Sequence, residues 1–241
     1  MAVAVGMRIR LDKYLADMGY GTRSQVKQQI ARGNISVNGN PAKRPEMKID
    51  TETDQVSYCG ANAAYEQYEY YMLNKPAGVV SATEDRRAST VLDLLCERKR
   101  KDLFPVGRLD KDTEGLLLIT NDGDLAHRLL SPGKHVDKVY YAEVDGRVTA
   151  EDAALFLRGV DIGDEKKTLP ARLEILKTSE RSAVRLTICE GRFHQVKRMF
   201  HAVGKEVVFL KRLQMGSLQL DDNLKPGEYR KLTREEVERL C

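Results

Sequence analysis

One acidic side chain in this sequence lies where a carboxylate can do chemistry. Asp110 belongs to the run GRLDKDTEGLLLIT, residues 107–120, and sits in a glycine-bounded turn directly before an apolar segment. A carboxylate that acts as a nucleophile or base needs an open approach and a rigid support, and a loop that leads into a buried strand supplies both. On spacing alone, the alternative is a turn-forming Asp that hydrogen-bonds its own backbone. Asp110 is therefore the candidate catalytic residue.

Two further carboxylates, Asp112 and Glu114, follow Asp110 in the same run. Glycoside hydrolases generally work with a pair of carboxylates, so a hydrolase that cuts a glycosidic bond is one interpretation. The simpler interpretation is that Asp112 and Glu114 shape the loop around Asp110. The two interpretations differ in their product, because a hydrolase would release a free base.

The sequence contains no pattern typical of a metal or cofactor site. The four cysteines form no CxxC pair, and His194 and His201 lie seven residues apart, whereas helical metal ligands typically lie four apart. There is no Walker A motif and no GxGxxG segment after a strand. We therefore expect a reaction that needs neither a metal ion nor a nucleotide cofactor.

The composition indicates a globular protein. The chain has 241 residues, of which 41% are hydrophobic and 32% charged, which is enough for one or two domains with real cores. Its apolar runs are far shorter than the roughly 20 residues that span a bilayer, so we expect no membrane partner. Residues 1–6 are too short and too poor in charge for a secretory signal. We expect a cytoplasmic protein with reduced thiols.

Positive charge is concentrated near the N-terminus. Between Met7 and Lys48 the chain has nine basic and three acidic residues, a net charge of +6 in a chain whose total is +4. Such polarity favours an N-terminal module that faces a polyanion, although a solvated basic surface gives the same pattern. Arg10, Arg23 and Lys27 could line one basic face that binds phosphate, and Lys13 and Arg32 are further candidate contacts.

The N-terminal segment has the local signals of two short helices and a hairpin. Apolar residues recur at helical spacing between Leu11 and Met18. Thr22 and Gln25 have the spacing of a capping box at the start of a second helix that ends near Gly33. Residues 35–37 alternate as a strand, and the Asn-Gly pair at 38–39 predicts a hairpin turn.

The remaining sequence predicts many strands with helices between them. The expected strands are residues 69–74, 115–120, 139–144, 171–176, 183–189 and 206–210, and the expected helices are residues 89–96, 124–130, 150–157, 194–203 and 234–240. Because strands and helices do not alternate regularly, we expect an α+β domain with a mainly antiparallel mixed sheet.

The N-terminal segment resembles the S4 RNA-binding module. The resemblance rests on RLDKYLA at residues 10–16, Ser24, and IARGNISVNG at residues 30–39, and it implies a small α/β RNA-binding domain over residues 7–60. The segment that follows lacks periodicity, so we assign residues 61–68 to a linker and residues 69–241 to a second domain.

Three separated segments of the second domain are similar to the RsuA family of ribosomal RNA pseudouridine synthases. They are YMLNKPAG at residues 71–78, GRLD at 107–110 with Thr113, Gly115 and Leu116, and EGRFHQVKRM at 190–199. The resemblance implies an isomerase with a pseudouridine synthase fold that converts a uridine of ribosomal RNA to pseudouridine. The C1′–N1 bond breaks, the uracil turns, and C5 is joined to C1′ without a cofactor.

The same resemblance implies roles for three residues. Asp110 takes the place of the family's catalytic carboxylate, as nucleophile or as base, and the sequence leaves both roles open. Arg192 resembles the residue that pairs with this carboxylate, and a guanidinium could hold it bidentately. Arg108 is the competing partner, or an RNA contact. Tyr140 resembles the aromatic residue that packs on the flipped uracil, although strands also contain Tyr for packing alone.

The resemblance also implies the partner. We expect ribosomal RNA or a pre-ribosomal particle, and we favour the small subunit because the chain ends without a long basic tail. The charged face of residues 194–203, with Lys197 and Arg198, is an RNA contact or a solvated helix face. A monomer is the default expectation. The alternatives are the same reaction on 23S ribosomal RNA, and a non-catalytic S4-type RNA-binding protein.

Overall fold

The computed structural model describes residues 7–240, which form two compact units. The N-terminal unit contains residues 7–69 together with Glu97–Asp102, and the C-terminal unit contains Tyr70–Cys96 and residues 103–240. This division differs from the expected boundaries. Residues 61–62 form a strand and Ala63 is buried, so the start of the expected linker belongs to the N-terminal unit, and the segment at 97–102 returns to it.

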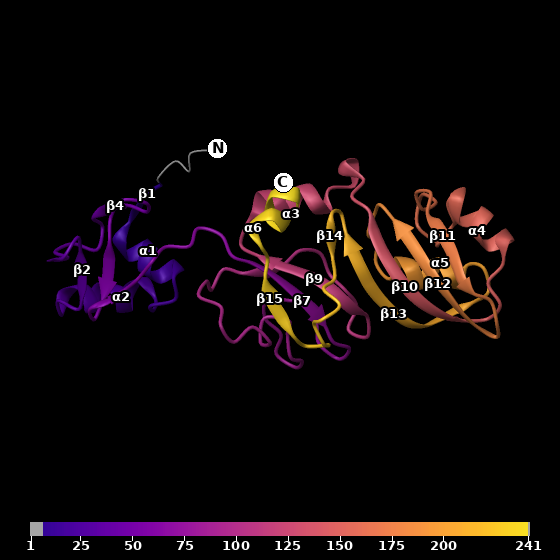
Figure 1. Cartoon of the computed structure of the whole chain (residues 1–241), viewed down its shortest axis with the longest axis horizontal. Coiled ribbons are helices and arrows are strands. Elements are labelled where there is room, and N and C mark those ends of the chain that lie inside the picture. The colour runs from indigo at the N-terminus through magenta and orange to yellow at the C-terminus, as the bar shows by residue number, and fades with distance from the viewer. Residues whose placement is uncertain (1–6, 241) are drawn as a thin grey trace. The chain divides into compact units, whose positions relative to one another are not determined.

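The N-terminal unit combines two short helices with two small sheets (Figure 1). Strands β1 and β4 pair with each other, and the second sheet has the order β3-β2-β5-β6. The elements are β1 (Arg8–Arg10), α1 (Leu11–Asp17), α2 (Arg23–Ala31), β2 (Ile35–Val37), β3 (Asn40–Pro41), β4 (Lys48–Asp50), β5 (Val56–Tyr58) and β6 (Ala61–Asn62).

The expected local signals of this unit are present. The Thr22 backbone N–H donates to the Gln25 side chain at 2.8 Å, and the Gln25 N–H donates to the Thr22 hydroxyl at 3.3 Å, which completes the capping box of α2. Asn38 and Gly39 both have positive φ, as the hairpin turn requires. The apolar stripe of α1 packs with α2 and the strands in one core, which includes Leu11, Tyr14, Leu15, Met18, Val26 and Ile30.

One sheet organises the C-terminal unit. Among residues 70–240, nine strands join in the order β11-β12-β10-β13-β9-β7-β15, with β14 on β13 and β8 on β9. Their bounds are β7 (Tyr70–Lys75), β8 (Phe104–Pro105), β9 (Glu114–Thr120), β10 (Lys138–Asp145), β11 (Arg172–Lys177), β12 (Arg181–Ile188), β13 (Glu206–Met215), β14 (Leu218–Gln219) and β15 (Tyr229–Lys231). The strands pair antiparallel except for β13 with β9, so the expected mainly antiparallel α+β fold is confirmed.

The parallel contact between β13 and β9 joins the two parts of the sheet (Figure 1). Arg212 of β13 lies opposite Gly115 of β9. A Cβ atom on Gly115 would lie 2.3 Å from the carbonyl oxygen of Arg212, and Gly115 has φ of 99°. Both facts require glycine. This close approach places the loop before β9 next to β13 and β10.

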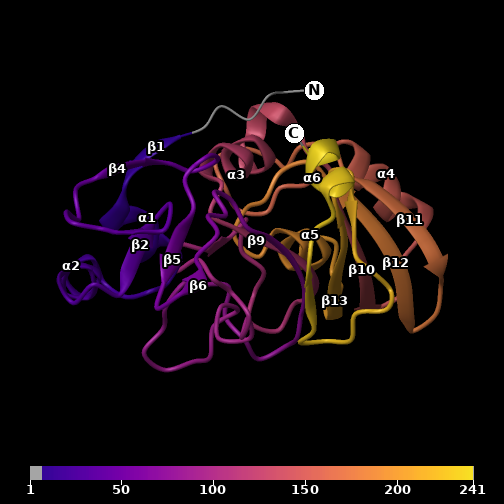
Figure 2. The ribbon, with the colours of Figure 1, turned by 60° about the vertical axis from the view of Figure 1, so that its left-hand side comes forward.

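The helices pack against different parts of the sheet, and α5 (Gln195–His201) lies over it beside β13. In Figures 1 and 2, α3 (Gly123–Leu130) and α6 (Arg234–Leu240) lie close together, and α4 (Ala150–Leu157) lies beside β11. The remaining element is the short 3₁₀ helix η1 (Pro132–Lys134), and the apolar residues Val196, Met199 and Phe200 of α5 are buried. No helix among residues 7–240 is long and apolar enough to cross a bilayer.

The predicted helix at residues 89–96 is wrong. Thr90 forms a bridge with Val80, and the segment continues as turns. The Asp93 carboxylate accepts hydrogen bonds from the Thr90 N–H at 2.8 Å and from its hydroxyl at 3.0 Å. These bonds close a turn at residues 90–93 that does not continue into a helix. The apolar residues that suggested a helix, among them Val91 and Leu95, are buried in the core instead.

Candidate active site

Asp110 lies in the loop between β8 and β9, with 24% of its side chain exposed. The loop is fixed on both sides of this residue. The Ser81 hydroxyl donates to the Leu109 carbonyl at 2.9 Å and accepts from the Leu109 N–H at 3.1 Å. The Thr113 N–H donates to the Asp110 carbonyl at 3.1 Å. The carboxylate is therefore accessible on a rigid support, as the sequence predicted.

Lys75, at the end of β7, supports this loop from below. Its side chain is fully buried, and its ammonium donates to the carbonyls of Pro76 at 3.0 Å, Lys111 at 3.3 Å and Thr113 at 2.8 Å. Burial lowers the pKa of Lys75 to about 8, although the charges of Asp112, Glu114 and Asp110 oppose the shift. Lys75 thus donates hydrogen bonds to three carbonyls at the base of the Asp110 loop, a role that the sequence did not indicate.

The cation beside Asp110 is Lys197 of α5. Its Nζ lies 3.3 Å from Oδ2 of Asp110 and 2.6 Å from Oδ1 of Asp112. Burial alone would lower the pKa of Lys197, but the hydrogen bond to Asp112 and the charge of Asp110 hold it above its usual value. The Lys197 hydrogen bond lowers the pKa of Asp112 in turn. His194 approaches from the other side, with Nε2 3.5 Å from Oδ1 of Asp110.

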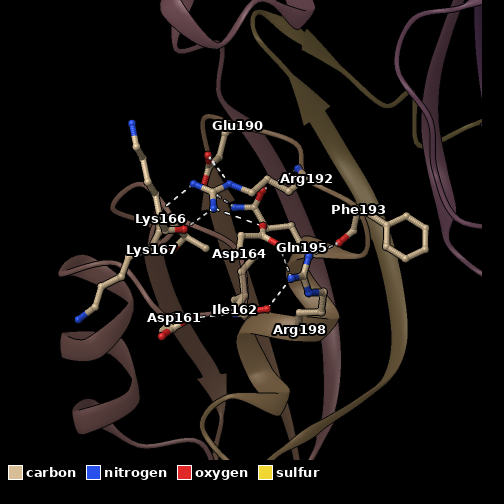
Figure 3. Close-up of polar contacts among 12 residues, drawn as sticks. Asp161, Ile162, Asp164, Lys166, Lys167, Glu190, Arg192, Phe193, Gln195 and Arg198 are labelled. Carbon is tan, nitrogen blue, oxygen red and sulfur yellow. Dashed lines mark hydrogen bonds and ion pairs between the residues drawn. The ribbon is translucent and has the colours of Figure 1, made fainter.

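The expected pairing of Arg192 with Asp110 is wrong. The Arg192 guanidinium contacts Glu190 at 3.0 Å and Asp164 at 3.4 Å, and it donates to the carbonyls of Lys166 at 2.6 Å and Lys167 at 2.8 Å (Figure 3). These acceptors already occupy the planar donor set of the guanidinium. Arg192 lines the pocket next to Asp110, but its side chain connects the loop at 190–194 to the loop at 161–168.

Arg198 belongs to the same connection. Its Nη2 atom donates to the Ile162 carbonyl and to Asp164 at 2.5 Å, and its Nη1 atom donates to the Phe193 carbonyl at 3.1 Å. The guanidinium is therefore engaged within the protein. These bonds make the Arg198 side chain less available for the RNA contact that we expected on this helix face.

Tyr140 of β10 lines the same pocket as Asp110, with only 8% of the residue exposed. The neighbouring Tyr141 lies on the other face of the strand, where its ring packs edge-on against Phe209. This alternation is the one that β geometry predicts. Tyr140 thus offers an aromatic surface in the pocket that contains the carboxylate.

The pocket has a volume of about 110 Å³ and opens into a larger surface hollow of about 710 Å³. Its wall includes two buried basic residues, Lys138 and Arg212, which the sequence analysis did not single out. Arg212 donates to the Leu116 carbonyl at 2.8 Å, and burial, with Arg212 nearby, lowers the pKa of Lys138. Arg108 is exposed at the rim of the hollow. These groups give the site a positive electrostatic environment.

The predicted RNA-binding residues of the N-terminal unit fall into two groups. Arg10 contacts Asp12 through two hydrogen bonds of 3.0 and 2.8 Å, and Lys13 contacts Asp17 at 2.6 Å. The exposed side chains of Arg23, Lys27 and Arg32 have no hydrogen bond or ion pair with another residue in the range 7–240. The second group is therefore the freer to meet phosphate.

The described residues contain no group of three or more His, Cys, Asp or Glu side chains that could hold a metal ion. The site consists instead of a supported carboxylate, a paired ammonium and a buried aromatic ring inside a positively charged pocket. Together with a basic N-terminal module, this arrangement defines an enzyme that acts on a nucleic acid.

Comparisons with known proteins specify this class. Residues 69–202 match the family model of RNA pseudouridylate synthase, and residues 9–56 match the S4 domain. The chain therefore belongs to the RNA pseudouridylate synthase family, and it carries an N-terminal S4 domain. As a member, it is an isomerase that converts uridine in RNA to pseudouridine.

Relatives match the chain almost from end to end. The uncharacterized RNA pseudouridine synthase YtzG of Bacillus subtilis (strain 168) is 51% identical over 95% of this chain and 97% of the relative. Ribosomal small subunit pseudouridine synthase A of Escherichia coli (strain K12) is 43% identical over 95% of this chain and 98% of the relative. A crystal structure of a pseudouridylate synthase, 39% identical, superposes with a TM-score of 0.69 over 97% of this chain and all of that chain.

Proposed function

We propose that this enzyme isomerises a specific uridine of small-subunit (16S) ribosomal RNA, with Asp110 as the catalytic carboxylate. The observation that carries the assignment is the position of Asp110, which faces Lys197 at 3.3 Å in a pocket that also contains the ring of Tyr140. A carboxylate that must act as nucleophile or base is needed in its ionised form, and a nearby ammonium favours that form.

The reaction conserves all atoms of the nucleotide. The uridine leaves the stack and enters the pocket, and the C1′–N1 bond breaks with assistance from Asp110. Asp110 assists either by attacking C1′ or by removing a ribose proton. The uracil turns, C5 forms the bond to C1′, and C5 loses its proton while N1 gains one. Tyr140 packs on the uracil and keeps water away from the exposed intermediate.

Lys138 and Arg212 give the pocket wall a positive charge, which suits a uracil ring that carries negative charge once the C1′–N1 bond has broken. The S4 domain supplies affinity for the RNA backbone through Arg23, Lys27 and Arg32. All of these side chains belong to a single chain, and we propose that the enzyme works as a monomer in the cytoplasm. Analytical ultracentrifugation at micromolar concentration tests the monomeric state, because a dimer would give twice the molar mass of the chain.

The small-subunit assignment is supported by relatives named ribosomal small subunit pseudouridine synthase A, which are 42–44% identical over 95% of this chain. The test uses purified enzyme with deproteinised 16S and 23S ribosomal RNA transcripts in separate reactions. Carbodiimide labelling followed by primer extension maps pseudouridine to a position. We expect one site in 16S RNA and none in 23S RNA. Modification of 23S RNA alone would contradict the assignment.

Two other outcomes distinguish the remaining candidates. A glycosidic hydrolase would release free uracil, which chromatography of the reaction mixture detects, whereas isomerisation leaves the mass of the RNA unchanged. A protein that only binds RNA would yield neither uracil nor pseudouridine. We expect pseudouridine without free uracil.

A further inference from the structure

Phe193 has a large apolar side chain that is exposed to solvent. With 75% of the residue exposed, it is the most exposed large hydrophobic residue among residues 7–240. It lies in the loop between β12 and α5, within the segment EGRFHQVKRM. Side chains of this size are usually buried, and an exposed one beside an active site has a free face for a partner.

The loop holds the backbone of Phe193 while its ring stays free. The Phe193 carbonyl accepts a hydrogen bond from Arg198 at 3.1 Å, and the Arg192 N–H donates to the Gln195 side chain at 2.9 Å. Figure 3 shows the Phe193 ring pointing away from this polar cluster. The ring is therefore presented by an ordered loop, which reduces the entropy lost when a partner binds it.

One face of the Phe193 ring is already stacked. It lies on the His194 ring with centroids 3.8 Å apart and planes 19° apart. His194 adopts the left-handed conformation, with φ of 48° and ψ of 32°, at the start of α5. Its Nε2 atom lies 3.5 Å from Oδ1 of Asp110. The two rings thus form a short stack that begins at the catalytic carboxylate and ends in solvent.

The stack lies in the surface hollow that leads to the pocket. Phe193 and His194 line this hollow together with Arg108, whose side chain is exposed. An aromatic ring beside an exposed guanidinium is the combination that proteins use for unpaired nucleotides, since the ring takes the base and the cation takes the phosphate.

We propose that Phe193 is a stacking site for an unpaired nucleobase that flanks the target uridine. The proposal rests on the proposed function and names a further contact of the same site. The reacting ribose must approach Asp110, but a base on the free face of Phe193 is separated from Asp110 by both rings. That base is therefore a neighbour of the target. The ring offers no hydrogen-bond donor or acceptor, so it accepts any of the four bases.

Kinetics of Phe193→Ala test the site in the reaction. Stacking on an aromatic side chain contributes about 1–3 kcal/mol per base, so we expect kcat/KM on 16S RNA to fall about 5- to 150-fold, mainly through KM. Phe193→Tyr, which keeps the stacking surface, should retain nearly the wild-type value. Val208→Ala is the matched control, because Val208 of β13 is also apolar and 49% exposed. A Phe193→Ala enzyme with wild-type kcat/KM would overturn the proposal.

Fluorescence tests the contact without requiring catalysis. The chain contains no tryptophan, so Phe193→Trp and Val208→Trp each create a protein with a single reporter. We expect 16S RNA to quench the emission at position 193 and leave that at position 208 nearly unchanged. Polyphosphate, a polyanion without bases, should quench neither. Equal quenching by RNA and polyphosphate at position 193, or equal quenching at both positions, would overturn base stacking.

The two tests separate this proposal from the proposed function. If 16S RNA quenched the emission at position 193 but was not modified by the enzyme, the stacking site would be retained and the small-subunit assignment would be refuted. Normal modification of 16S RNA without quenching, and with full activity of Phe193→Ala, would refute the stacking site alone.

Discussion

The ammonium of Lys197 lies 3.3 Å from the Oδ2 atom of Asp110, across the gap between helix α5 and the loop before β9. The same ammonium contacts Asp112 at 2.6 Å, so one cation serves two carboxylates of the loop. A charge-assisted contact of this kind favours the ionised form of a carboxylate and restricts its direction. Lys197 is thus the cation that contacts Asp110 directly and restricts the direction of its carboxylate.

We predict that Lys197→Met lowers kcat on 16S RNA by about 10- to 150-fold, since hydrogen bonds to charged groups contribute about 1.5–3 kcal/mol. Lys197→Arg keeps the positive charge with a different geometry, so its kcat should fall less than that of Lys197→Met. Single-turnover kinetics at saturating enzyme measure the effect on the chemical step. If Lys197→Met matched the wild type in that assay, the contact with Asp110 would have no catalytic role.

Arg192→Met should behave differently, because Arg192 connects two loops and does not contact Asp110. Its loss leaves the carbonyls of Lys166 and Lys167 without their donor, and because both bonds are exposed and water can replace the donor, we expect the free energy of unfolding to fall by about 0.5–1.5 kcal/mol. Urea denaturation followed by circular dichroism measures this change. Lys197→Met serves as the comparison: its side chain is equally exposed but contacts carboxylates in place of backbone carbonyls, so its free energy of unfolding should fall by less. Equal stability of the two variants would contradict the assigned role of Arg192.

The pH dependence should reveal Lys75. Burial lowers its pKa to about 8, and only the ammonium has enough N–H donors for the carbonyls of Pro76, Lys111 and Thr113. Above this pH the neutral amine leaves one carbonyl unpaired. We therefore expect log kcat/KM to bend downward above about pH 8. In Lys75→Met, kcat/KM should be lower at every pH, and the downward bend above about pH 8 should be absent.

Stability should move in the opposite direction over the same interval. Between about pH 8 and 10.5, the folded protein has released the Lys75 proton and the unfolded chain still binds it. The free energy of unfolding therefore rises with pH there, by about 3 kcal/mol for this group. Denaturation of wild type and Lys75→Met at pH 7.5 and 10 measures the difference. An identical pH dependence in both proteins would place the Lys75 pKa near its ordinary value.

The S4 domain should supply salt-sensitive affinity. Arg23 and Lys27 are exposed on α2 and have no ion pair within residues 7–240, so their double replacement by Ala should remove up to two phosphate contacts. The slope of log affinity against log salt should then flatten by about 1.4–1.8. Filter binding of 16S RNA over a range of salt concentrations measures the slope. Lys13→Ala is the control, because Asp17 already neutralises Lys13 at 2.6 Å, and it should change the slope less.

Local sequence was enough to place Asp110 in a glycine-bounded turn before a strand, whereas Tyr140, which lines the same pocket, was singled out by the resemblance to the pseudouridine synthases. The partner of Asp110 could not be found in this way. Lys197 meets Asp110 only because β9 and β13 pair in parallel, a contact between segments far apart in the sequence. The motif pointed to Arg192, five residues earlier, whose side chain turns to the loop at 161–168 instead.

The sequence also did not reveal which basic residues are buried. Lys75 ends a strand next to proline, where a lysine is usually exposed, and its burial depends on carbonyls that the distant loop supplies. Strand β15 was missed because Tyr229–Lys231 is short and charged, and it forms by pairing with β7. The helix expected at residues 89–96 is absent. Its apolar residues are buried in the core from a segment of turns, in which Asp93 accepts a hydrogen bond from the Thr90 N–H.

Replacement of Asp110 tests its proposed role as the catalytic carboxylate. Asp110→Asn keeps the shape of the side chain and removes its ability to act as nucleophile or base. The decisive measurement is pseudouridine formed in 16S RNA during a single turnover with excess enzyme, together with RNA affinity measured on the same preparation. We expect no pseudouridine above background, with nearly wild-type RNA affinity. Turnover within about tenfold of wild type would contradict this role, because loss of an essential base or nucleophile lowers the rate far more than that.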